Sequence, residues 1–596
     1  MSRVPLRPLA RILSARQKGE DHKAIENENI HQRMLAARGR QRQMAEGRLL
    51  IASICFAVAF SAVGVKMFAL SSTEPREPRT ASSASKIYAQ RANIVDRNGR
   101  ILATNLSTYS LYAQPHLMTD PENSAVELAT IFPDLGVEDL LEDFTGKRKF
   151  LWIKKKISPE QKQRVHDIGD PGLLFGPREM RLYPNGKLAA HVLGGAGFGR
   201  EDVHSAEVIG NAGVERTFDA FLRDPAQENA PLELAIDLSV QDTAERVLYG
   251  GMKLMNAKAA SSVLMDVKTG EIISLVSLPD FDPNTRPNPK VTLDAADNPL
   301  FNRAVQGVYE LGSTFKLFTI AQALELGLMN KNTMIPTRGP LVWGKFKIRD
   351  FHDYGAKLSV TDVLVKSSNI GTAKIAIDIG VKRQKEFLDS LGLLTATPLE
   401  ISEAAGGRPQ LPPNWSELSA MTISYGHGIA NSPVHLAAAY SSILNGGYKV
   451  EPTILKNPNP ERGERVVSEQ VSATMRDLLR QVVVRGTASF GEVAGYEVGG
   501  KTGTADKPNP QGGYYEDKVI ATFASVFPAS NPRYVLIVTL DEPSENSGAK
   551  PRRTAGWTAV PVAAEMIRRI APLVGLRPVI EPGPGFGIVQ AKGSSQ

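Results

Sequence analysis

The stretch Tyr309-Glu-Leu-Gly-Ser-Thr-Phe-Lys316 decides the fold, because in it a helix begins at a serine that a lysine follows three residues later. Apolar residues then recur with helical spacing, at Leu317, Phe318, Ile320, Ala321, Leu324 and Leu326. Ser313 is therefore expected at a helix N-terminus, where free backbone N–H groups and the helix dipole stabilise developing negative charge. Because residues three apart share a helix face, Lys316 can reach the serine hydroxyl and, when neutral, accept its proton.

The Ser-x-x-Lys pattern occurs three times in the chain, so its context decides which match is meaningful. Ser83 and Lys86 lie in a polar linker, and Ser547 and Lys550 lie in a late loop, where nothing holds the two side chains in register. An isolated match is more often a capping serine beside a solvated lysine. Only Ser313 opens an apolar helix, which favours a catalytic nucleophile.

A second motif, Ser367-Ser-Asn369, precedes another apolar helical segment. The hydroxyl of Ser367 can relay a proton to a leaving amine, and Asn369 can both donate and accept hydrogen bonds. The structural alternative is a helix N-cap, which is the commoner role for such a serine. Another Ser-x-Asn, Ser544-Glu-Asn546, lies in the same late loop as one of the rejected serines.

A third motif, Lys501-Thr-Gly-Thr504, ends a strand-like run whose edge can pair with the backbone of a substrate peptide. There Lys501 and Thr502 can bind a terminal carboxylate, and the N–H of Thr504 can join that of Ser313 in an oxyanion hole. Lys268-Thr-Gly270 repeats the pattern but is most simply a turn between two strands. The substrate-binding residues predicted for this strand are Thr502, Gly503 and Thr504.

Composition excludes several other classes. The nine histidines show no His-Glu-x-x-His and no zinc spacing with the one cysteine, so neither a metal nor another cofactor is predicted. Cys55 lies in an apolar run and has no partner for an intramolecular disulfide. The net charge of +7 is concentrated in residues 1–48, where eleven lysines and arginines face five acidic residues. Such a basic leader sets membrane orientation more often than it binds nucleic acid, so no nucleic-acid partner is predicted.

The longest apolar stretch, residues 49–70, is interrupted only by Lys66. A helix of this length spans about 33 Å, enough for a hydrocarbon core of about 30 Å. We therefore predict one transmembrane helix with the N-terminus in the cytoplasm and the rest of the chain outside it, in the periplasm of a Gram-negative cell. A cleaved signal peptide is the alternative, against which the long preceding leader argues.

The strand patterns predict the domain organisation. A strand, an Asn-Gly turn and a second strand are expected over Arg91–Ala103. Later strands are expected at both ends of a helix-rich middle, over 260–267, 271–278, 496–503, 519–527 and 534–540. This arrangement predicts an α+β fold with helices segregated against an antiparallel sheet. The predicted segments are a leader (1–48), a transmembrane helix (49–70), a linker (71–86), an elongated mixed α/β pedestal (87–232), a catalytic domain (233–575) and a Pro/Gly-rich tail (576–596).

On these motifs the catalytic domain resembles the penicillin-binding proteins and serine β-lactamases, whose motif set is S-x-x-K, S-x-N or S-D-N, and K-T-G. Tyr309–Lys316 is similar to the family's Y-E-P-G-S-T-F-K, and Gly500–Ala505 agrees throughout. The motif at 367–369 lacks the central aspartate, as in the high-molecular-weight transpeptidases. Ser424-Tyr-Gly-His-Gly428 also matches apart from His427, for which packing is preferred over a place at the cleft rim.

The pedestal carries the resemblance further. Arg91…Gly99 is similar to the class B signature R-G-x-I-x-D-R-x-G, with Ala92 in place of the glycine, and Arg181-Leu-Tyr-Pro184 and Gly210…Glu215 extend the likeness. The short leader, the single anchor and the lack of a glycosyltransferase domain are similar to class B members. Size and leader are most similar to the cell-division type, and the elongation-specific type is the alternative.

The resemblance implies acyl transfer in two steps. Lys316 activates Ser313, which attacks the penultimate D-Ala of a stem pentapeptide, and the terminal D-Ala leaves with a proton passed through Ser367. Either Lys316 or Ser367 can take the proton of Ser313. The amine of a neighbouring stem peptide then resolves the acyl-enzyme, and β-lactams trap Ser313. The implied partners are peptidoglycan stem peptides, the inner membrane, other division proteins and a membrane glycosyltransferase of the shape, elongation, division and sporulation family. The implied location is the inner membrane at the division septum.

Three other functions share parts of this pattern. A β-lactamase would use the same motifs and hydrolyse its acyl-enzyme, but the anchor and the large pedestal disfavour it. A membrane β-lactam sensor would need a cytoplasmic output module, for which the leader is too short. A catalytically silent scaffold is disfavoured because the motifs at Ser313, Ser367 and Lys501 are all intact.

Overall fold

The computed structural model describes residues 7–21, 52–67, 91–201, 206–227, 229–288, 295–509 and 511–579, with a few positions between 23 and 35. Before residue 91 it shows α1 (Arg7–Lys18) and a helix over residues 52–67. Within these ranges, no helix is both long and apolar enough to cross a membrane. The predicted transmembrane helix (49–70) extends past the described residues at both ends, and the linker (71–86) lies outside them, so both stay predictions.

The smaller of two compact units takes in residues 112–153 and 163–174, together with described residues before 68. Its helices are α3 (Pro121–Ile131), α4 (Val137–Thr145) and most of α5 (Pro159–Ile168). Three aromatic rings pack together in this unit. The ring centroid of Phe150 lies 5.2 Å from that of Tyr112 and 5.1 Å from that of Trp152. The unit therefore has apolar packing of its own.

The pedestal is built on a five-stranded sheet with the order β3-β2-β1-β7, in which β4 also pairs with β2. Its strands are β1 (Ile94–Val95), β2 (Ile101–Ala113), β3 (Leu151–Ile157), β4 (Leu173–Leu182) and β7 (Leu232–Glu233). The antiparallel pair β1–β2 confirms the hairpin predicted over Arg91–Ala103, and Gly99 takes a φ of +80° in its turn. The pedestal also contains a hairpin of two strands and three short helices. The strands are β5 (Gly195–Glu201) and β6 (Ala206–Ala212), and the helices are α6 (Ala190–Leu193), α7 (Gly213–Thr217) and α8 (Asp219–Leu222).

A second five-stranded sheet forms the centre of the catalytic region. All its neighbouring strands are antiparallel, in the order β14-β15-β16-β8-β9. They are β8 (Ala259–Asp266), β9 (Ile272–Leu278), β14 (Gly499–Pro508), β15 (Tyr514–Phe527) and β16 (Tyr534–Asp541). Strands from both ends of the region meet where β16 pairs with β8, which confirms the predicted α+β class. Lys268-Thr-Gly270 forms the turn between β8 and β9, as predicted for the second Lys-Thr-Gly.

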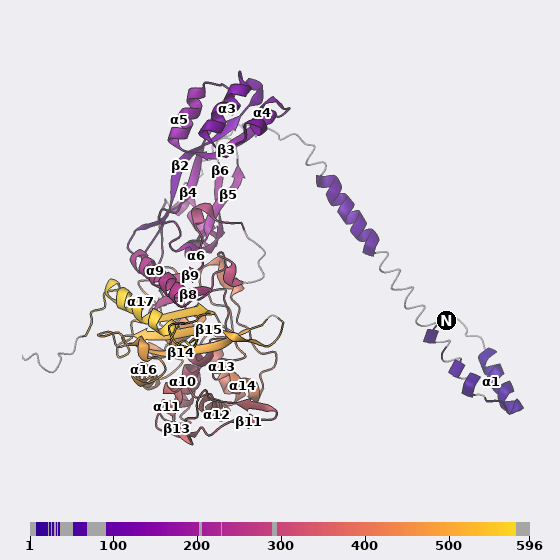
Figure 1. Cartoon of the computed structure of the whole chain (residues 1–596), viewed down its shortest axis with the longest axis vertical. Coiled ribbons are helices and arrows are strands. Elements are labelled where there is room, and N and C mark those ends of the chain that lie inside the picture. The colour runs from indigo at the N-terminus through magenta and orange to yellow at the C-terminus, as the bar shows by residue number, and fades with distance from the viewer. Residues whose placement is uncertain are drawn as a thin grey trace, which may run out of the picture. The chain divides into compact units, whose positions relative to one another are not determined.

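Helices cover this sheet on both faces (Figure 1). On one face α9 (Leu238–Leu254) packs against α17 (Ala559–Leu573), while α16 (Glu469–Arg485) lies against β14 on the other. The helix α15 (Pro433–Leu444) is buried along its whole length and contacts β8 and β16. A helical subdomain follows on the α16 side and comprises α10 (Lys316–Glu325), α11 (Val360–Val365), α12 (Asn369–Ile379), α13 (Val381–Ser390) and α14 (Glu417–Ile423).

Two short hairpin-like pairs complete the subdomain. β10 (Met334–Pro336) pairs with β13 (Lys357–Ser359), and β11 (Leu341–Trp343) pairs with β12 (Phe346–Ile348). The β11–β12 hairpin lies between Ser313 and the Ser-Ser-Asn motif along the chain, and it had no counterpart among the sequence predictions. Its strands are only three residues long, too short for an alternating pattern to stand out.

Candidate active site

Ser313 lies in a 3-10 turn, η5 (Gly312–Phe315), and the α-helix α10 begins only at Lys316. The predicted helix start is therefore correct in place, but its first turn is tighter than an α-helix. The side chain of Ser313 is partly exposed, and its hydroxyl makes no hydrogen bond within the described part of the chain. A hydroxyl held at a helix start without a fixed partner is available to attack a substrate.

Strand β14 packs directly on this turn. A Cβ atom on Gly503 would collide with the carbonyl oxygen of Leu311, and one on Gly312 would stand 2.9 Å from the oxygen and 3.2 Å from the nitrogen of Thr504. Gly312 also has a φ of +55°, which an L side chain rarely adopts. Because β14 is the terminal strand of the sheet order, its second edge stands beside Ser313, where a substrate peptide can add as a further strand.

Lys316 is buried and directs its ammonium at the second motif. Its Nζ donates hydrogen bonds to the carbonyl oxygen of Ser367 at 2.6 Å, to the hydroxyl of Ser367 at 3.0 Å and to Oδ1 of Asn369 at 2.7 Å. The first two predicted motifs therefore meet through side chains that lie about fifty residues apart in the sequence.

Lys501 joins the same cluster. It is also buried, and its Nζ donates to the Ser367 hydroxyl at 3.0 Å and to the carbonyl oxygen of Thr502 at 3.0 Å. The structure thus brings Ser367 and both lysines together. It adds that Lys501 contacts Ser367, whereas the sequence assigned it only to a substrate carboxylate, and that second role stays a prediction.

The two lysines are held in an environment that favours their neutral forms. Burial lowers the pKa of Lys501 to about 7. Burial lowers the pKa of Lys316 well below its usual value, and the charge of Lys501 lowers it further, while Asp350 acts in the opposite direction. A lysine whose pKa is lowered is more readily neutral and can then act as a base.

The side chains of Thr502 and Thr504 also anchor the strand. The hydroxyl of Thr502 shares a hydrogen bond of 2.7 Å with that of Thr487, and the hydroxyl of Thr504 accepts from the backbone N–H of Ala555 at 3.0 Å. These contacts hold the Lys-Thr-Gly-Thr strand in place beside Ser313. The predicted carboxylate contacts and the oxyanion hole are consistent with this position and stay predictions.

Asp350 is a residue of the site that sequence reasoning missed. Its carboxylate accepts hydrogen bonds from the hydroxyl of Ser368 at 2.7 Å and from the backbone N–H groups of Asn369 at 2.6 Å and Ile370 at 3.0 Å. Ser368 in turn caps α12 by accepting from the N–H of Gly371 at 2.9 Å. The N-cap that was the structural alternative for this motif is therefore Ser368, whereas Ser367 and Asn369 contact Lys316.

His427 packs between two tyrosines. Its ring centroid lies 5.4 Å from that of Tyr425 and 6.5 Å from that of Tyr514. Nearby, Glu310 accepts hydrogen bonds from the N–H of Gly428 at 2.7 Å and from the hydroxyl of Tyr514 at 3.0 Å. These contacts support the packing interpretation of His427.

Of the two rejected Ser-x-x-Lys motifs, the structure describes the later one. Ser547 and Lys550 are found in an irregular segment after β16, whereas Ser83 and Lys86 lie outside the described residues. Among the residues that the structure describes, no group of three histidine, cysteine, aspartate or glutamate side chains is placed to hold a metal ion.

Two protein families match the chain. The penicillin-binding protein transpeptidase domain matches residues 260–562, and the penicillin-binding protein dimerisation domain matches residues 86–227. These ranges fall close to the predicted catalytic domain (233–575) and pedestal (87–232), whose boundaries stay predictions.

Curated relatives and a solved structure agree with these matches. The chain is 35% identical over 531 residues to a probable peptidoglycan D,D-transpeptidase FtsI of Caulobacter vibrioides, covering 87% of each protein. It is 29% identical over 490 residues to peptidoglycan D,D-transpeptidase FtsI of Escherichia coli K12, covering 77% of this chain and 80% of that protein. A crystal structure of penicillin-binding protein 3 from Mycobacterium tuberculosis, complexed with ampicillin, is similar with a TM-score of 0.62 and 26% identity, covering 83% of this chain and 98% of that one.

The chain therefore belongs to the penicillin-binding protein transpeptidases. Within that family it is of the class B, FtsI type, as its relatives are, and it is a serine D,D-transpeptidase. The elongation-specific alternative is not favoured by these relatives.

Proposed function

We propose that this enzyme cross-links peptidoglycan stem peptides at the division septum through an acyl-enzyme on Ser313, and that β-lactams inhibit it by acylating the same serine. The observation that carries the proposal is the hydroxyl of Ser367, which lies 3.0 Å from the Nζ atoms of both Lys316 and Lys501 beside the turn that holds Ser313. This cluster can move protons between the serine, the leaving amine and the attacking amine.

In the first step the peptide adds to the free edge of β14. Lys316, in its neutral form, takes the proton from Ser313 as the serine oxygen attacks the carbonyl of the penultimate D-Ala. The N–H groups of Ser313 and Thr504 stabilise the oxyanion, because the backbone of Thr504 lies against Gly312. The proton then passes through Ser367 to the departing D-Ala.

In the second step an amine of a neighbouring stem peptide attacks the ester carbonyl. Its proton returns through the same lysines and Ser367 to Ser313, whose bond to the acyl group breaks. The site can serve both steps because Ser367 accepts hydrogen bonds from both lysines and so connects them. The general base is assigned to Lys316 because it follows Ser313 by one helical turn and its pKa is lowered.

The first test locates the acylated residue. The full chain, solubilised in detergent, is treated with penicillin and the adduct is located by peptide mass mapping. We expect one adduct on Ser313, its loss in Ser313→Ala, and its retention in Ser547→Ala, which removes the serine of a rejected motif. An adduct elsewhere, or an adduct that survives in Ser313→Ala, contradicts the proposal.

The cellular part of the proposal rests on the sequence of the N-terminal region and on the FtsI-type relatives. We propose that residues 49–70 anchor the enzyme in the inner membrane, with the catalytic region in the periplasm, and that it works at the septum. Its proposed partners are other division proteins and a membrane glycosyltransferase of the shape, elongation, division and sporulation family.

Fractionation and microscopy test this location. The full chain is expected in the membrane fraction after a salt wash, and a chain that begins at residue 87 is expected in the soluble fraction. Depletion of the enzyme is expected to block division and give filaments or branched cells, whereas rounded cells would indicate a role in elongation.

A further inference from the structure

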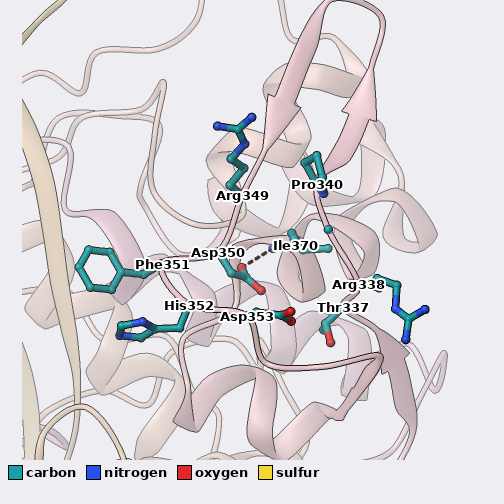
Figure 2. A pocket seen from close by; sticks show the side chains of 10 residues that line it. Thr337, Arg338, Pro340, Arg349, Asp350, Phe351, His352, Asp353 and Ile370 are labelled. Atoms are coloured by element: carbon teal, nitrogen blue, oxygen red, sulfur yellow. Dashed lines mark hydrogen bonds between the residues drawn. The ribbon is translucent and has the colours of Figure 1, made fainter.

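A pocket with a volume of about 280 Å³ lies where the two arms of the β11–β12 hairpin join the rest of the subdomain. One arm contributes residues 337–340, the other contributes residues 349–353, and Ile370 of α12 completes the lining. Figure 2 shows Arg338 and Arg349 on opposite arms, with the Asp350 carboxylate between them and directed at Ile370. We call this cavity the hairpin pocket.

Hydrogen bonds connect the hairpin pocket to the catalytic cluster. Asp350 lines it and holds the Ser-Ser-Asn motif by three hydrogen bonds of 2.6 to 3.0 Å. The side-chain amide of Asn369 donates to the carbonyl oxygen of Arg349 at 3.1 Å, and its oxygen accepts from Lys316 at 2.7 Å. One asparagine side chain therefore separates the pocket wall from the Lys316 ammonium.

Two arginines and two aspartates line the hairpin pocket. Eight lysines and arginines against three aspartates fall between Lys331 and Lys374, although the chain beyond its leader is close to neutral overall. Within the described part of the chain, no acidic side chain pairs with the exposed Arg338 or Arg349. The carboxylates of the pocket are in use, since Asp350 holds the motif and Asp353 accepts from the N–H of Gly355 at 2.9 Å. The two arginines are therefore left to pair with carboxylates of a ligand.

The rim adds an apolar surface. The side chain of Phe351 is 81% exposed, and its ring centroid lies 4.9 Å from that of His352. Figure 2 shows both rings on the same side of the pocket, away from Arg338. A large apolar side chain left in water beside a charged pocket favours a ligand with both apolar and charged parts, as a peptide has.

We propose that the hairpin pocket binds the second substrate, an anionic peptide that carries the amine which resolves the acyl-enzyme. This inference rests on the proposed function and assigns a place to its second step. Arg338 and Arg349 pair with carboxylates of that peptide, and Phe351 covers its apolar part.

The order of the reaction requires such a separate surface. When the second peptide arrives, the first is still bonded to Ser313 and occupies the edge of β14. The incoming chain must bind elsewhere and still place its amine near Lys316, and the pocket adjoins Asn369, which contacts that lysine. The amine nitrogen then forms a bond to the acyl carbon, the bond from that carbon to the oxygen of Ser313 breaks, and the proton of the amine passes to that oxygen.

The test separates the two steps of the reaction. The detergent-solubilised full chain is given a peptide that ends in D-Ala-D-Ala, with increasing amounts of an amine-bearing acceptor peptide, and the hydrolysis and aminolysis products are quantified by chromatography. The acceptor is used with free carboxylates and with the carboxylates amidated. Acylation by penicillin is measured in parallel.

In the double variant Arg338→Gln/Arg349→Gln we expect the acceptor concentration for half-maximal aminolysis to rise about tenfold, since each exposed charge pair contributes a few-fold. With the amidated acceptor, wild type and variant should differ less than twofold. The control Arg246→Gln removes an exposed arginine of α9, which pairs only with Asp242 among the described residues, and should change neither value.

Two results would overturn the inference: an unchanged aminolysis curve in the double variant, or an equal loss with free and amidated acceptors. An equal fall in penicillin acylation would also overturn it, because the arginines would then act through the Ser-Ser-Asn motif. Absence of acylation in the wild type would overturn the proposed function, and with it this inference.

Discussion

A single hydroxyl, that of Ser367, connects the two buried lysines of the site. Ser367 holds a φ of +62°, a conformation that a serine adopts only when its surroundings impose it. Its oxygen lies 3.0 Å from the Nζ atoms of Lys316 and Lys501. Two ammonium groups so close to one oxygen repel each other, so the pair loses its first proton at an unusually low pH.

This arrangement predicts the pH dependence of acylation. Because Lys316 must be neutral to accept the serine proton, the acylation rate should rise with pH and level off well below 10.5, the ordinary pKa of lysine. A chromogenic β-lactam in stopped-flow measurements from pH 5 to about 10 reports the curve. A midpoint near the ordinary lysine value would contradict the assigned base.

The variant Lys501→Met tests the coupling between the lysines. Removal of the neighbouring positive charge raises the pKa of Lys316, so the midpoint of the acylation curve should move to higher pH. The shift is informative even when the maximal rate falls, because a merely structural loss lowers the rate without moving the midpoint. A shift to lower pH, or none, would show that the two lysines are not coupled.

The free energy of unfolding should depend on pH through the lowered pKa of Lys501. Its pKa in the folded chain is about 7, whereas a lysine in the unfolded chain titrates near 10.4, so the unfolded chain binds more protons between these two pH values. The contribution of Lys501 to the free energy of unfolding therefore rises with pH across this window. Chemical unfolding of wild type and Lys501→Met at pH 7 and 9 checks that the difference between them changes with this sign.

Asp350 is predicted to position the second motif. Asp350→Asn keeps the shape of the side chain but removes the negative charge that accepts three hydrogen bonds. The acylation rate should therefore fall about tenfold, which corresponds to an increase of roughly 1–2 kcal/mol in the activation free energy. The melting temperature should change by only a few degrees, since the three weakened hydrogen bonds all lie at one loop. Asp353→Asn, at an exposed neighbour, serves as the control; equal rates in both variants would remove Asp350 from the site.

At the scale of elements, the decisive contact is the one between β14 and η5. Strand β14 pairs with β15 over its length, with Lys501 opposite Ala524 and Gly503 opposite Thr522. Its other edge reaches the turn of Ser313 only because Gly503 lacks a side chain. The strand thereby carries Lys501 to Ser367 and leaves an edge for the substrate.

Gly503→Ala should therefore separate the strand from the turn. The added Cβ would collide with the carbonyl oxygen of Leu311, so we expect penicillin acylation to fall at least a hundredfold and the free energy of unfolding to fall by about 1–3 kcal/mol. The matched control Gly250→Ala places a Cβ in open space on helix α9 and should be neutral or stabilising by up to about 1 kcal/mol. Near-normal acylation in Gly503→Ala would contradict the packing argument.

At the scale of the whole molecule, a buried ion cluster holds the class B-like signature of the pedestal in place. Glu215 accepts from Arg91 at 2.7 Å and from Arg181 at 2.6 Å, and all three side chains are buried. Tyr183 adds its hydroxyl at 3.2 Å. The cluster joins segments more than a hundred residues apart, which gives the resemblance at Arg91 and Glu215 a physical basis.

Glu215→Gln should destabilise the chain strongly. The variant removes the counter-ion of the buried Arg181, while Arg91 keeps its ion pair with Asp219 at 2.7 Å, and breaking such a buried pair costs about 3–5 kcal/mol. Denaturant unfolding of the solubilised chain measures the loss, with Glu565→Gln on the surface of α17 as a control that should change stability by less than about 1 kcal/mol. Acylation of the remaining folded protein at low temperature should be retained, because Glu215 lies outside the catalytic cluster.

Much of the fold followed from local pattern. The strands at both ends of the catalytic region, the hairpin at 91–103 and the helix that starts beside Ser313 were all visible as periodicity and turn chemistry. Local context was also sufficient to reject the turn at 268–270 and the loop at Ser547. The 3-10 form of the Ser313 turn and the three-residue strands of the β11–β12 hairpin were not visible, since they depend on packing against β14 and α12.

The sequence alone predicts Ser313 as the nucleophile, because its motif, its helix start and the order of the Ser367 and Lys501 motifs can all be read along the chain. Tertiary structure decided what surrounds that serine. It brought Lys501 into contact with the hydroxyl of Ser367, from which it is separated by 134 positions in the sequence. It also brought Asp350 to the second motif and formed the hairpin pocket beside that motif. The physical reason is that burial, pKa and contacts across such separations arise only when the sheet and the helical subdomain pack together.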